Sequence, residues 1–295
     1  MAEIVTKNLT KRYGERKGVF DLNIEIARGE AFGLIGPNGA GKTTLIRNLL
    51  GFISPDSGQC FIRNLNSFRE AKEAHRALGY MPGETAFFES IKGSEYLQFC
   101  EELRKSKAGK RKEELLERFE LNPGVKVRHM SKGMKQKLGL VAAMMFDPEI
   151  YILDEPTSGL DPLMQQRFVE LVLEEKRKGK TLLISSHSFD EIEKTCDRIG
   201  ILKEGRLMTD QGVSQLQKSR RRVYSLDFED EKSASDFLKE GFELVQQSGS
   251  RLDIAVTGSV KPLVDKLARY PVNGLDVLTH SLEDAFMTYY GEERQ

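Results

Sequence analysis

The sequence predicts an α/β protein in which helices cover a largely parallel sheet and a smaller α+β domain follows. Two observations predict the parallel sheet. Apolar strand-like runs alternate with helical segments between residues 31 and 202, and a glycine-rich turn joins the first run to a helix. A third observation predicts the second domain, because the strand and helix pattern starts again after the polar segment 215–222.

The first 30 residues predict a small antiparallel sheet, because apolar and polar side chains alternate there as in half-buried strands. Apolar side chains recur every two or three positions: Val19, Leu22, Ile24 and Ile26. Residues 31–35 then form a continuous apolar run that is typical of a buried strand. Residues 36–41 predict the turn, and residues 43–50 predict a helix that ends at Gly51.

A helical insert is predicted from about residue 90 to 145, where apolar side chains recur at helical spacing. Strand signals return in three later runs, at residues 149–153, 181–185 and 198–202. Two helices separate these runs, at residues 162–178 and 189–195. Asp161 and Pro162 form a favourable N-cap and first position for the longer helix. Together these elements predict one domain over residues 1–214.

Residues 215–222 are interpreted as a linker, and residues 223–295 as a separate accessory domain. Its predicted order is strand, helix, strand, strand, helix, strand, over residues 223–228, 231–239, 242–247, 251–257, 259–270 and 275–279. That order is typical of a ferredoxin-like sandwich of about 60 residues, on which a final helix at 281–290 would dock. No residue pattern in this domain indicates chemistry.

The composition disfavours several classes of protein. The 45 basic and 45 acidic side chains balance, so no nucleic-acid partner is expected, and Arg220–Arg222 is interpreted as a basic linker. Cys60, Cys100 and Cys196 lie far apart without metal-like spacing, which disfavours a disulfide framework or a zinc site and favours the cytosol. The longest apolar run, residues 138–146, is about half of a membrane span, and no signal peptide is expected.

Nine residues between the first buried strand and its helix match the pattern GxxxxGK[ST]: Gly36, Pro37, Asn38, Gly39, Ala40, Gly41, Lys42, Thr43 and Thr44. Glycines let successive backbone N–H groups face inward, and the helix start adds a positive dipole, so the loop can hold phosphate. Lys42 would reach the β and γ phosphates of a nucleotide, and the Thr43 hydroxyl would bind Mg²⁺. The flanking strand and helix disfavour an ordinary glycine-rich turn.

Two adjacent carboxylates, Asp154 and Glu155, follow the strand at residues 149–153. Ligands of parallel sheets bind outside the carboxyl ends of the strands. Asp154 would therefore orient Mg²⁺, and Glu155 would act as the general base that polarises the attacking water. Two acids after a strand are by themselves often a solvated turn, and the phosphate loop favours the catalytic interpretation.

Four further features allow both a structural and a functional interpretation. Ser131, with Gly133, begins an amphipathic helix, where it would form a second phosphate-binding end or only a helix cap. Asp161 ends the segment Ser158–Asp161 and is a helix cap in the simpler interpretation. His187 follows a strand beside the expected nucleotide, and Tyr13 lies near an early strand, although a single histidine or tyrosine is more often structural.

In this order, the motifs resemble the ATP-binding subunits of ABC transporters over residues 4–209. The resemblance implies a role for each: residues 36–44 as the Walker A loop, 150–155 as the Walker B strand with the catalytic glutamate, 158–161 as the D-loop, His187 as the switch histidine, and Tyr13 as a stacking partner of adenine. Residues 130–134 lie at the position of the signature LSGGQ and retain Ser131 and Gly133. This variant, SKGMKQ, and the ending 281–291 resemble the drug and peptide exporters with ABC-2-type membrane partners.

The resemblance implies that two copies pair head to tail around ATP and Mg²⁺, each closing the other's site with its Ser131 end and Asp161. It also implies a separate polytopic membrane subunit and a peripheral location at the cytoplasmic face of the cell membrane. That subunit would dock around residues 87–92, although packing of Phe87 and Phe88 inside the insert is equally expected.

The sequence departs from the family after Gly79–Pro82, where relatives usually carry a glutamine that senses Mg²⁺. Gly83 and Glu84 follow here, so we expect Glu84 or a water molecule to contact the metal.

The favoured function is an ATPase that powers export through a separate membrane protein. A soluble ABC-type ATPase acting on ribosomes or DNA is one alternative, although such proteins usually carry two cassettes or long coiled coils. An ATP-dependent regulatory module with little turnover is another, which Gly83 leaves open and which Glu155 and His187 disfavour.

Overall fold

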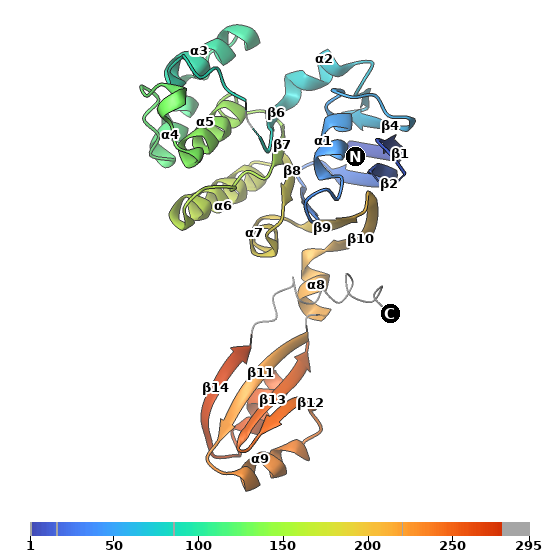
Figure 1. The fold of residues 1–295 in the computed structure, drawn as a ribbon, viewed down its shortest axis with the longest axis vertical. Coiled ribbons are helices and arrows are strands. Elements are labelled where there is room, and N and C mark those ends of the chain that lie inside the picture. The colour runs from blue at the N-terminus through green and yellow to red at the C-terminus, as the bar shows by residue number, and fades with distance from the viewer. Residues whose placement is uncertain (1, 16, 85, 220, 279–295) are drawn as a thin grey trace. The chain divides into compact units, whose positions relative to one another are not determined.

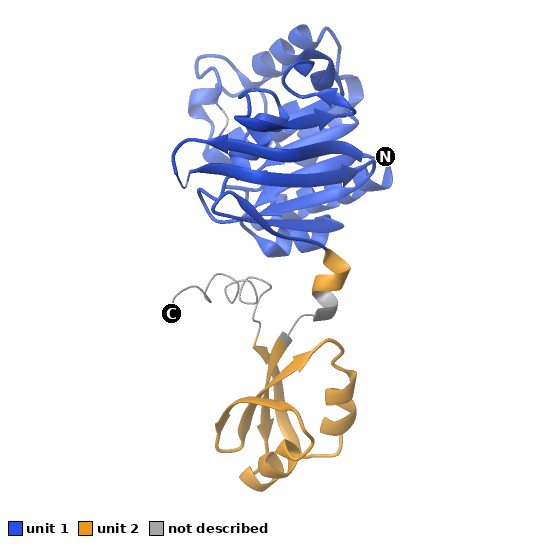
Figure 2. Cartoon of the chain, turned by 90° about the vertical axis from the view of Figure 1, so that its right-hand side faces the viewer, with its two compact units in different colours: residues 1–211 blue, residues 212–295 orange. Residues whose placement is uncertain are grey.

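The computed structural model describes residues 2–15, 17–84, 86–219 and 221–278. The chain divides into two compact units, residues 1–211 and 212–295 (Figure 1, Figure 2). The first unit holds two sheets and the second unit holds one. Nowhere among the described residues does a helix combine the length and the apolar character that crossing a bilayer would require.

An antiparallel sheet opens the first unit, with the strand order β2-β1-β4-β5. Its strands are β1 (Ala2–Arg12), β2 (Gly18–Ala27), β4 (Ser57–Ile62) and β5 (Leu65–Asn66). Ile4 pairs with Ile26 on one side and with Ile62 on the other, and all three side chains are fully buried. The alternating pattern of the first 30 residues thus gives β1 and β2 one buried face each, as predicted.

The second sheet has six strands in the order β10-β9-β3-β8-β7-β6. They are β3 (Ala31–Ile35), β6 (Leu78–Met81), β7 (Ile150–Asp154), β8 (Thr181–Ser186), β9 (Arg198–Lys203) and β10 (Arg206–Gly212). Strand β3 pairs in parallel with β8 and β9, and β7 pairs in parallel with β6 and β8. The carboxyl ends of β3, β7 and β8 therefore lie at one edge of the sheet.

Helices cover both faces of this sheet (Figure 1). Phe32 and Leu34 of β3 face a core that includes Leu45 and Ile46 of α1 (Lys42–Leu49). Gly33 faces the other way, and a Cβ on it would lie 2.1 Å from a side-chain carbon of α7 (Phe189–Thr195), so this helix packs closely on β3. Helix α6 (Pro162–Arg177) contacts α7, and the short helix α2 (Ala71–Ala74) contacts β5.

The predicted helical insert lies between β6 and β7. It contains α3 (Gly93–Arg104), α4 (Gly109–Arg118) and α5 (Lys132–Met144), with a 3₁₀ turn at Val127–His129. Each helix contributes a fully buried leucine, namely Leu97, Leu115 and Leu138. The aromatic ring of Phe87 lies 4.9 Å from that of Tyr96 on α3, and Phe88 lies close to Phe99 on the same helix. Phe88 nevertheless exposes 58% of its surface.

The second unit contains the elements α8 (Val213–Ser219), β11 (Arg221–Phe228), α9 (Glu231–Leu238), β12 (Glu243–Ser248), β13 (Arg251–Thr257), α10 (Lys261–Leu267) and β14 (Val272–Leu278). Its antiparallel sheet has the order β12-β13-β11-β14. A separate core forms around Phe228 and Phe237. Ser225, on the opposite face of β11, donates to Asp253 of β13 at 2.6 Å.

The segment interpreted as a linker, residues 215–222, contains most of α8 and the start of β11. Val213 and Leu216 are buried at helical spacing. The polar residues around this pair obscure the helical pattern in the sequence. The predicted final helix at 281–290 and the exporter-like ending at 281–291 lie outside the described residues.

Candidate nucleotide-binding site

The candidate site is a pocket of about 1170 Å³ at the carboxyl edge of the six-stranded sheet. Residues 37–44, in the loop between β3 and α1 and at the start of α1, line one wall. Two glycines are required by geometry. Gly41 adopts φ 108°, and a Cβ on Gly36 would lie 2.4 Å from the carbonyl oxygen of Leu202. The loop therefore follows a path that larger residues at these two positions would block.

Lys42 begins α1 and exposes only 6% of its surface. Its ammonium donates to the carbonyl oxygen of Gly36 at 2.5 Å and lies 3.2 Å from Oε1 of Glu155. A buried cation needs such partners to offset its lost hydration. The positive charge of Lys42 thus lies between the phosphate loop and the acid that follows β7.

Asp154 is the last residue of β7 and is 2% exposed. The Thr43 hydroxyl donates to its Oδ2 at 2.9 Å, and the Ser185 hydroxyl donates to its Oδ1. Mg²⁺ prefers such oxygen ligands and usually takes one or two from the protein and others from substrate phosphates. Within the described residues, no cluster of three or more His, Cys, Asp or Glu side chains could hold a metal alone. The Thr43–Asp154 pair therefore fits an ion that is shared with phosphate.

Glu155 has a backbone φ of 50°, a conformation that non-glycine residues rarely adopt. Its N–H donates to the carbonyl oxygen of Ser185 at 3.1 Å, and Gln136 of α5 donates to its carbonyl oxygen at 2.9 Å. The Glu155 carboxylate lies 2.6 Å from Nδ1 of His187. Strain of this kind persists where the surroundings hold it, and here it directs an acid into the pocket.

Tyr13 and Glu84, the expected adenine and metal contacts, both line the pocket. Tyr13 exposes 56% of its surface. Gly83 passes beside Asp154, since a Cβ on it would lie 3.4 Å from Oδ2 of that carboxylate. Tyr80 shares this wall, and burial, with the negative charge of Asp154 as a second cause, raises the pKa of Tyr80 to about 12. Its hydroxyl is therefore neutral at physiological pH.

Four residues of the predicted site do not line this pocket: Gly36, Ser131, Gly133 and Asp161. The Ser131 hydroxyl caps α5 by accepting a hydrogen bond from a first-turn N–H at 3.2 Å. Asp161 caps α6 in the same way at 3.0 Å, as its place before Pro162 predicts. A Cβ on Gly133 would lie 2.9 Å from the carbonyl oxygen of Gly159, so the start of α5 packs on the loop before α6.

Ser185 holds Asp154 in place and Gln136 holds Glu155, and neither is among the site residues that the sequence predicts. Ser185 is paired with Asp154 in the register of β7 and β8, and that pairing depends on the order of strands in the sheet. Gln136 lies one turn after Ser131, within the segment that the resemblance identified, so its position on the helix was an available signal. Four basic side chains also line the pocket: Lys17, Arg47, Lys132 and Lys135.

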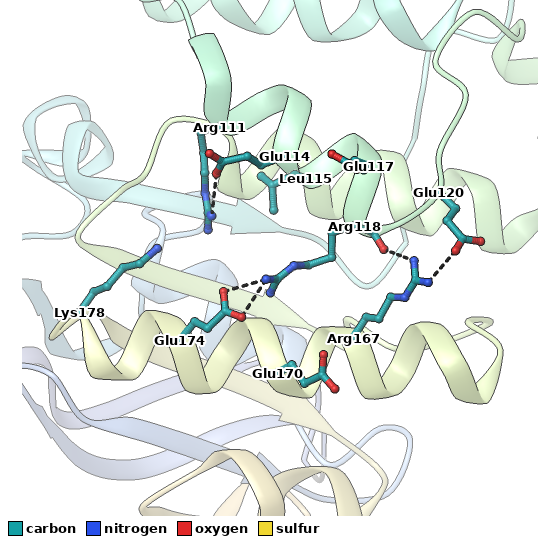
Figure 3. A pocket seen from close by; sticks show the side chains of 10 residues that line it. All are labelled: Arg111, Glu114, Leu115, Glu117, Arg118, Glu120, Arg167, Glu170, Glu174 and Lys178. Carbon is teal, nitrogen blue, oxygen red and sulfur yellow. Dashed lines mark hydrogen bonds and ion pairs between the residues drawn. The ribbon is translucent and has the colours of Figure 1, made fainter.

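A second pocket, of about 750 Å³, lies between α4 and α6 (Figure 3). Its wall is almost wholly charged, and the charges pair with one another. Arg118 of α4 donates to both carboxylate oxygens of Glu174 at 2.8 and 2.9 Å, and Arg167 of α6 lies 2.6 Å from Glu120. The acidic and basic groups of this pocket neutralise each other, and their ion pairs connect the helical insert to α6.

Comparisons with known proteins find relatives that match most of the chain. Residues 19–158 match the family described as ABC transporter. The chain is 36% identical to the bacitracin transport ATP-binding protein BcrA of Bacillus licheniformis, over 98% of this chain and 97% of that protein. It is 35% identical to the daunorubicin resistance ATP-binding protein DrrA3 of Streptomyces coeruleorubidus, over 72% of this chain and 69% of that protein.

A solved structure of an ATP-binding subunit of an ABC transporter has the same fold as the first unit. The two chains share 31% sequence identity and superimpose with a TM-score of 0.68, covering 72% of this chain and 91% of that one.

Proposed function

The chain belongs to the ABC transporter family as an ATP-binding subunit and an ATPase, and from this premise we propose the process that its ATP hydrolysis powers. We propose that it drives export of a drug-like or peptide-like compound through a separate ABC-2-type membrane protein. The similarity to the bacitracin transport and daunorubicin resistance proteins supports this proposal, and in the first of these it extends over almost the whole chain.

One observation carries the catalytic part of the proposal. The Glu155 carboxylate lies 3.2 Å from the Lys42 ammonium and 2.6 Å from Nδ1 of His187, beside the phosphate loop. In this arrangement, Glu155 polarises the attacking water as general base, Lys42 binds the β and γ phosphates, and His187 orients the base and the γ-phosphate. Tyr13 stacks on the adenine ring at the open side of the pocket.

Thr43 and Asp154 would hold Mg²⁺, with Glu84 or a water molecule completing its contacts. The ion, when bound, neutralises charge on the triphosphate and thereby favours attack on the γ-phosphate. Asp154 keeps its orientation through the hydroxyl of Ser185, so the protein supplies an oxygen pair whose position is already set.

We propose that two copies form the complete site. Ser131, Gly133 and Asp161 do not line the pocket of their own chain, which supports a role toward the nucleotide of a second copy. The start of α5 would then direct its N–H groups and helix dipole at the γ-phosphate. ATP would join the two copies, and its hydrolysis would release them.

The second unit is proposed to be an accessory domain with a ferredoxin-like fold. The element order β11, α9, β12, β13, α10, β14 and the sheet order β12-β13-β11-β14 support this assignment.

The membrane subunit is proposed to dock at Phe88, whose exposed ring lies at the junction of the insert and the core. That contact would give the chain a peripheral location at the cytoplasmic face of the membrane. An exposed aromatic ring at such a junction is a suitable anchor for a short helix of a partner.

The test is affinity purification of the full chain carrying Glu155→Gln from gently solubilised membranes, with ATP present. This change should lower kcat by roughly 10²–10⁴-fold while ATP stays bound. We expect a polytopic membrane protein to co-purify in equal amount. The matched control is Lys42→Ala, which loses the phosphate contact and should release the second copy.

Two other outcomes would overturn the proposal. Recovery with ribosomes or DNA, and with no membrane protein, would favour the soluble ATPase. Recovery without a partner, together with no measurable ATP turnover by the parent protein, would favour the regulatory module.

A further inference from the structure

Glu191 is a buried acid that the proposed mechanism does not use. It lies on α7 and exposes 8% of its surface, whereas its neighbour Asp190 is exposed. Its Oε2 accepts two hydrogen bonds, from the Thr157 hydroxyl at 2.8 Å and from the Ser186 hydroxyl at 2.8 Å. One carboxylate oxygen therefore joins two segments of chain that are about 30 residues apart.

These two segments carry the proposed catalytic groups. Thr157 lies two residues after Glu155, and Ser186 directly precedes His187. The Ser186 hydroxyl also accepts a hydrogen bond from the N–H of Ser188 at 3.0 Å, so the two residues that flank His187 are linked to each other. The contact between Glu155 and His187 thus spans the same two segments that Glu191 joins.

The positions of His187 and Glu155 both depend on the segments around them. The His187 side chain exposes 68% of its surface, so neighbouring side chains restrict it little. Glu155 has a strained backbone, which requires its surroundings to hold it. The connection through Thr157 and Ser186 adds to the hydrogen bonds that Ser185 and Gln136 make to the Glu155 backbone, and it links the Glu155 loop to the His187 loop.

Glu191 is an unfavourable choice for stability alone. Burial raises the pKa of its carboxyl, and its Oε1 has no hydrogen-bond partner among the described residues. A buried acceptor left unpaired costs free energy, so stability alone does not explain a glutamate at this position. Local rules are broken in this way most often at functional sites.

We propose that Glu191 is a positioning residue for ATP hydrolysis. By accepting hydrogen bonds from Thr157 and Ser186, it keeps the Glu155 loop and the His187 loop at the separation at which their side chains meet. The inference rests on the roles proposed above for Glu155 and His187. Glu191 itself contacts neither nucleotide nor water in the reaction.

The test compares Glu191→Gln with Glu191→Leu in the full chain, by kcat, KM and ATP affinity. Both replacements have nearly the size of glutamate, but only glutamine keeps an accepting oxygen. We expect Glu191→Gln to retain kcat within about twofold, and Glu191→Leu to lower kcat by roughly 10–100-fold with ATP affinity unchanged. The exposed neighbour provides a control, because Asp190→Asn should leave all three quantities at parental values.

Equal kcat values for Glu191→Gln and Glu191→Leu would overturn the inference, as would a parallel loss of kcat and ATP affinity in both. If Glu191→Leu does not fold, Thr157→Val and Ser186→Ala remove the two donors one at a time. Each should lower kcat without weakening ATP binding, and parental kcat in both would refute the positioning role.

The proposed function fails separately. If Glu155→Gln hydrolyses ATP like the parent, Glu155 is not the base, and the premise is wrong. If Glu155→Gln is inactive while the Glu191→Leu, Thr157→Val and Ser186→Ala variants are fully active, only the inference about Glu191 is wrong.

Discussion

Glu84 lies on the pocket wall next to Gly83, at the place where the resemblance stated from the sequence leads us to expect a glutamine. Because Gly83 has no side chain and passes beside Asp154, the neighbouring acid is the nearest substitute on this segment. We expect Glu84→Ala to raise the Mg²⁺ concentration needed for half-maximal ATPase activity by roughly tenfold. A magnesium titration of steady-state activity measures this.

Glu73, an exposed acid on α2 outside the pocket, gives the control for that titration. Glu73→Ala should behave like the parent. Identical magnesium curves for Glu84→Ala and Glu73→Ala would assign the remaining metal contacts to water and phosphate.

A second prediction concerns the Glu191 carboxyl and the way in which the free energy of unfolding depends on pH. Burial raises its pKa above the ordinary value of 4.5, and the negative charge of Glu155 adds to this, while hydrogen bonds from Ser186 and Thr157 and the nearby His187 oppose it. Below pH 4.5 the carboxyl is protonated in both the folded and the unfolded chain. As pH rises through the higher folded pKa, the unfolded chain binds fewer protons, and the stability contribution of this group is lost.

Glu191→Gln cannot titrate, so its free energy of unfolding relative to the parent should increase between pH 5 and pH 8. Urea unfolding at several pH values measures the difference. A difference that does not change with pH would mean that the folded and unfolded pKa values are the same.

At the scale of elements, α4 and α6 are joined by an exposed ion pair, which Figure 3 draws, and by a buried one. Arg118 and Glu174 are both partly exposed, at 29% and 34%. Glu175, the next residue on α6, is fully buried and accepts hydrogen bonds from Arg111 of α4 at 2.5 Å and from Tyr151 of β7 at 3.0 Å. The same two helices thus offer an exposed and a buried contact for comparison.

Glu175→Ala should lower the free energy of unfolding by about 3–5 kcal/mol, because it leaves the Arg111 guanidinium and the Tyr151 hydroxyl without their partner in a buried place. Glu174→Ala should cost less than about 1 kcal/mol, since water replaces an exposed pair. Urea denaturation of both variants tests this. Equal costs would show that the buried network adds nothing beyond a surface pair.

The starts of helices agree with the sequence prediction or with the local sequence where a side chain caps the first turn. Asp161 and Pro162 mark the start of α6, and Asp230 caps α9 by accepting from a first-turn N–H at 2.7 Å. Helix α10 is shorter than its predicted range, 259–270, and begins near Pro262, which is favourable in a first turn. Helix α8 was missed because its two buried apolar residues lie within a polar segment.

At the scale of the whole molecule, each unit has its own core. In the second unit, the Phe237 ring is fully buried and stacks at 5.5 Å on Phe242. Phe237→Ala should therefore destabilise this unit by about 3–5 kcal/mol and lower only its transition in calorimetry. Val264→Ala, on an exposed position of α10, should cost roughly 0.5 kcal/mol or less.

The transition of the first unit and the ATP affinity should be unchanged in both variants. A single transition that shifts as one in Phe237→Ala would show that the two units unfold together.

The sequence alone determined the alternation of strands and helices around the parallel sheet and the presence of a phosphate-loop motif. These depend on short-range chemistry: alternation for β1, apolar runs for β3, β7 and β8, and a contiguous motif at residues 36–44. Such signals lie within a few neighbouring residues, and they could be recognised before any packing was known.

Only the tertiary structure decided which distant residues meet. The sheet order places β8 beside β7, so the Ser185 hydroxyl donates to Asp154. The packing of α7 brings the Glu191 carboxylate within hydrogen-bond distance of both Thr157 and Ser186. No local pattern contains these contacts, because they arise from burying apolar faces of elements that are far apart in the chain. The place of the two acids after a buried strand was therefore readable from the sequence, while the contacts that hold them were not.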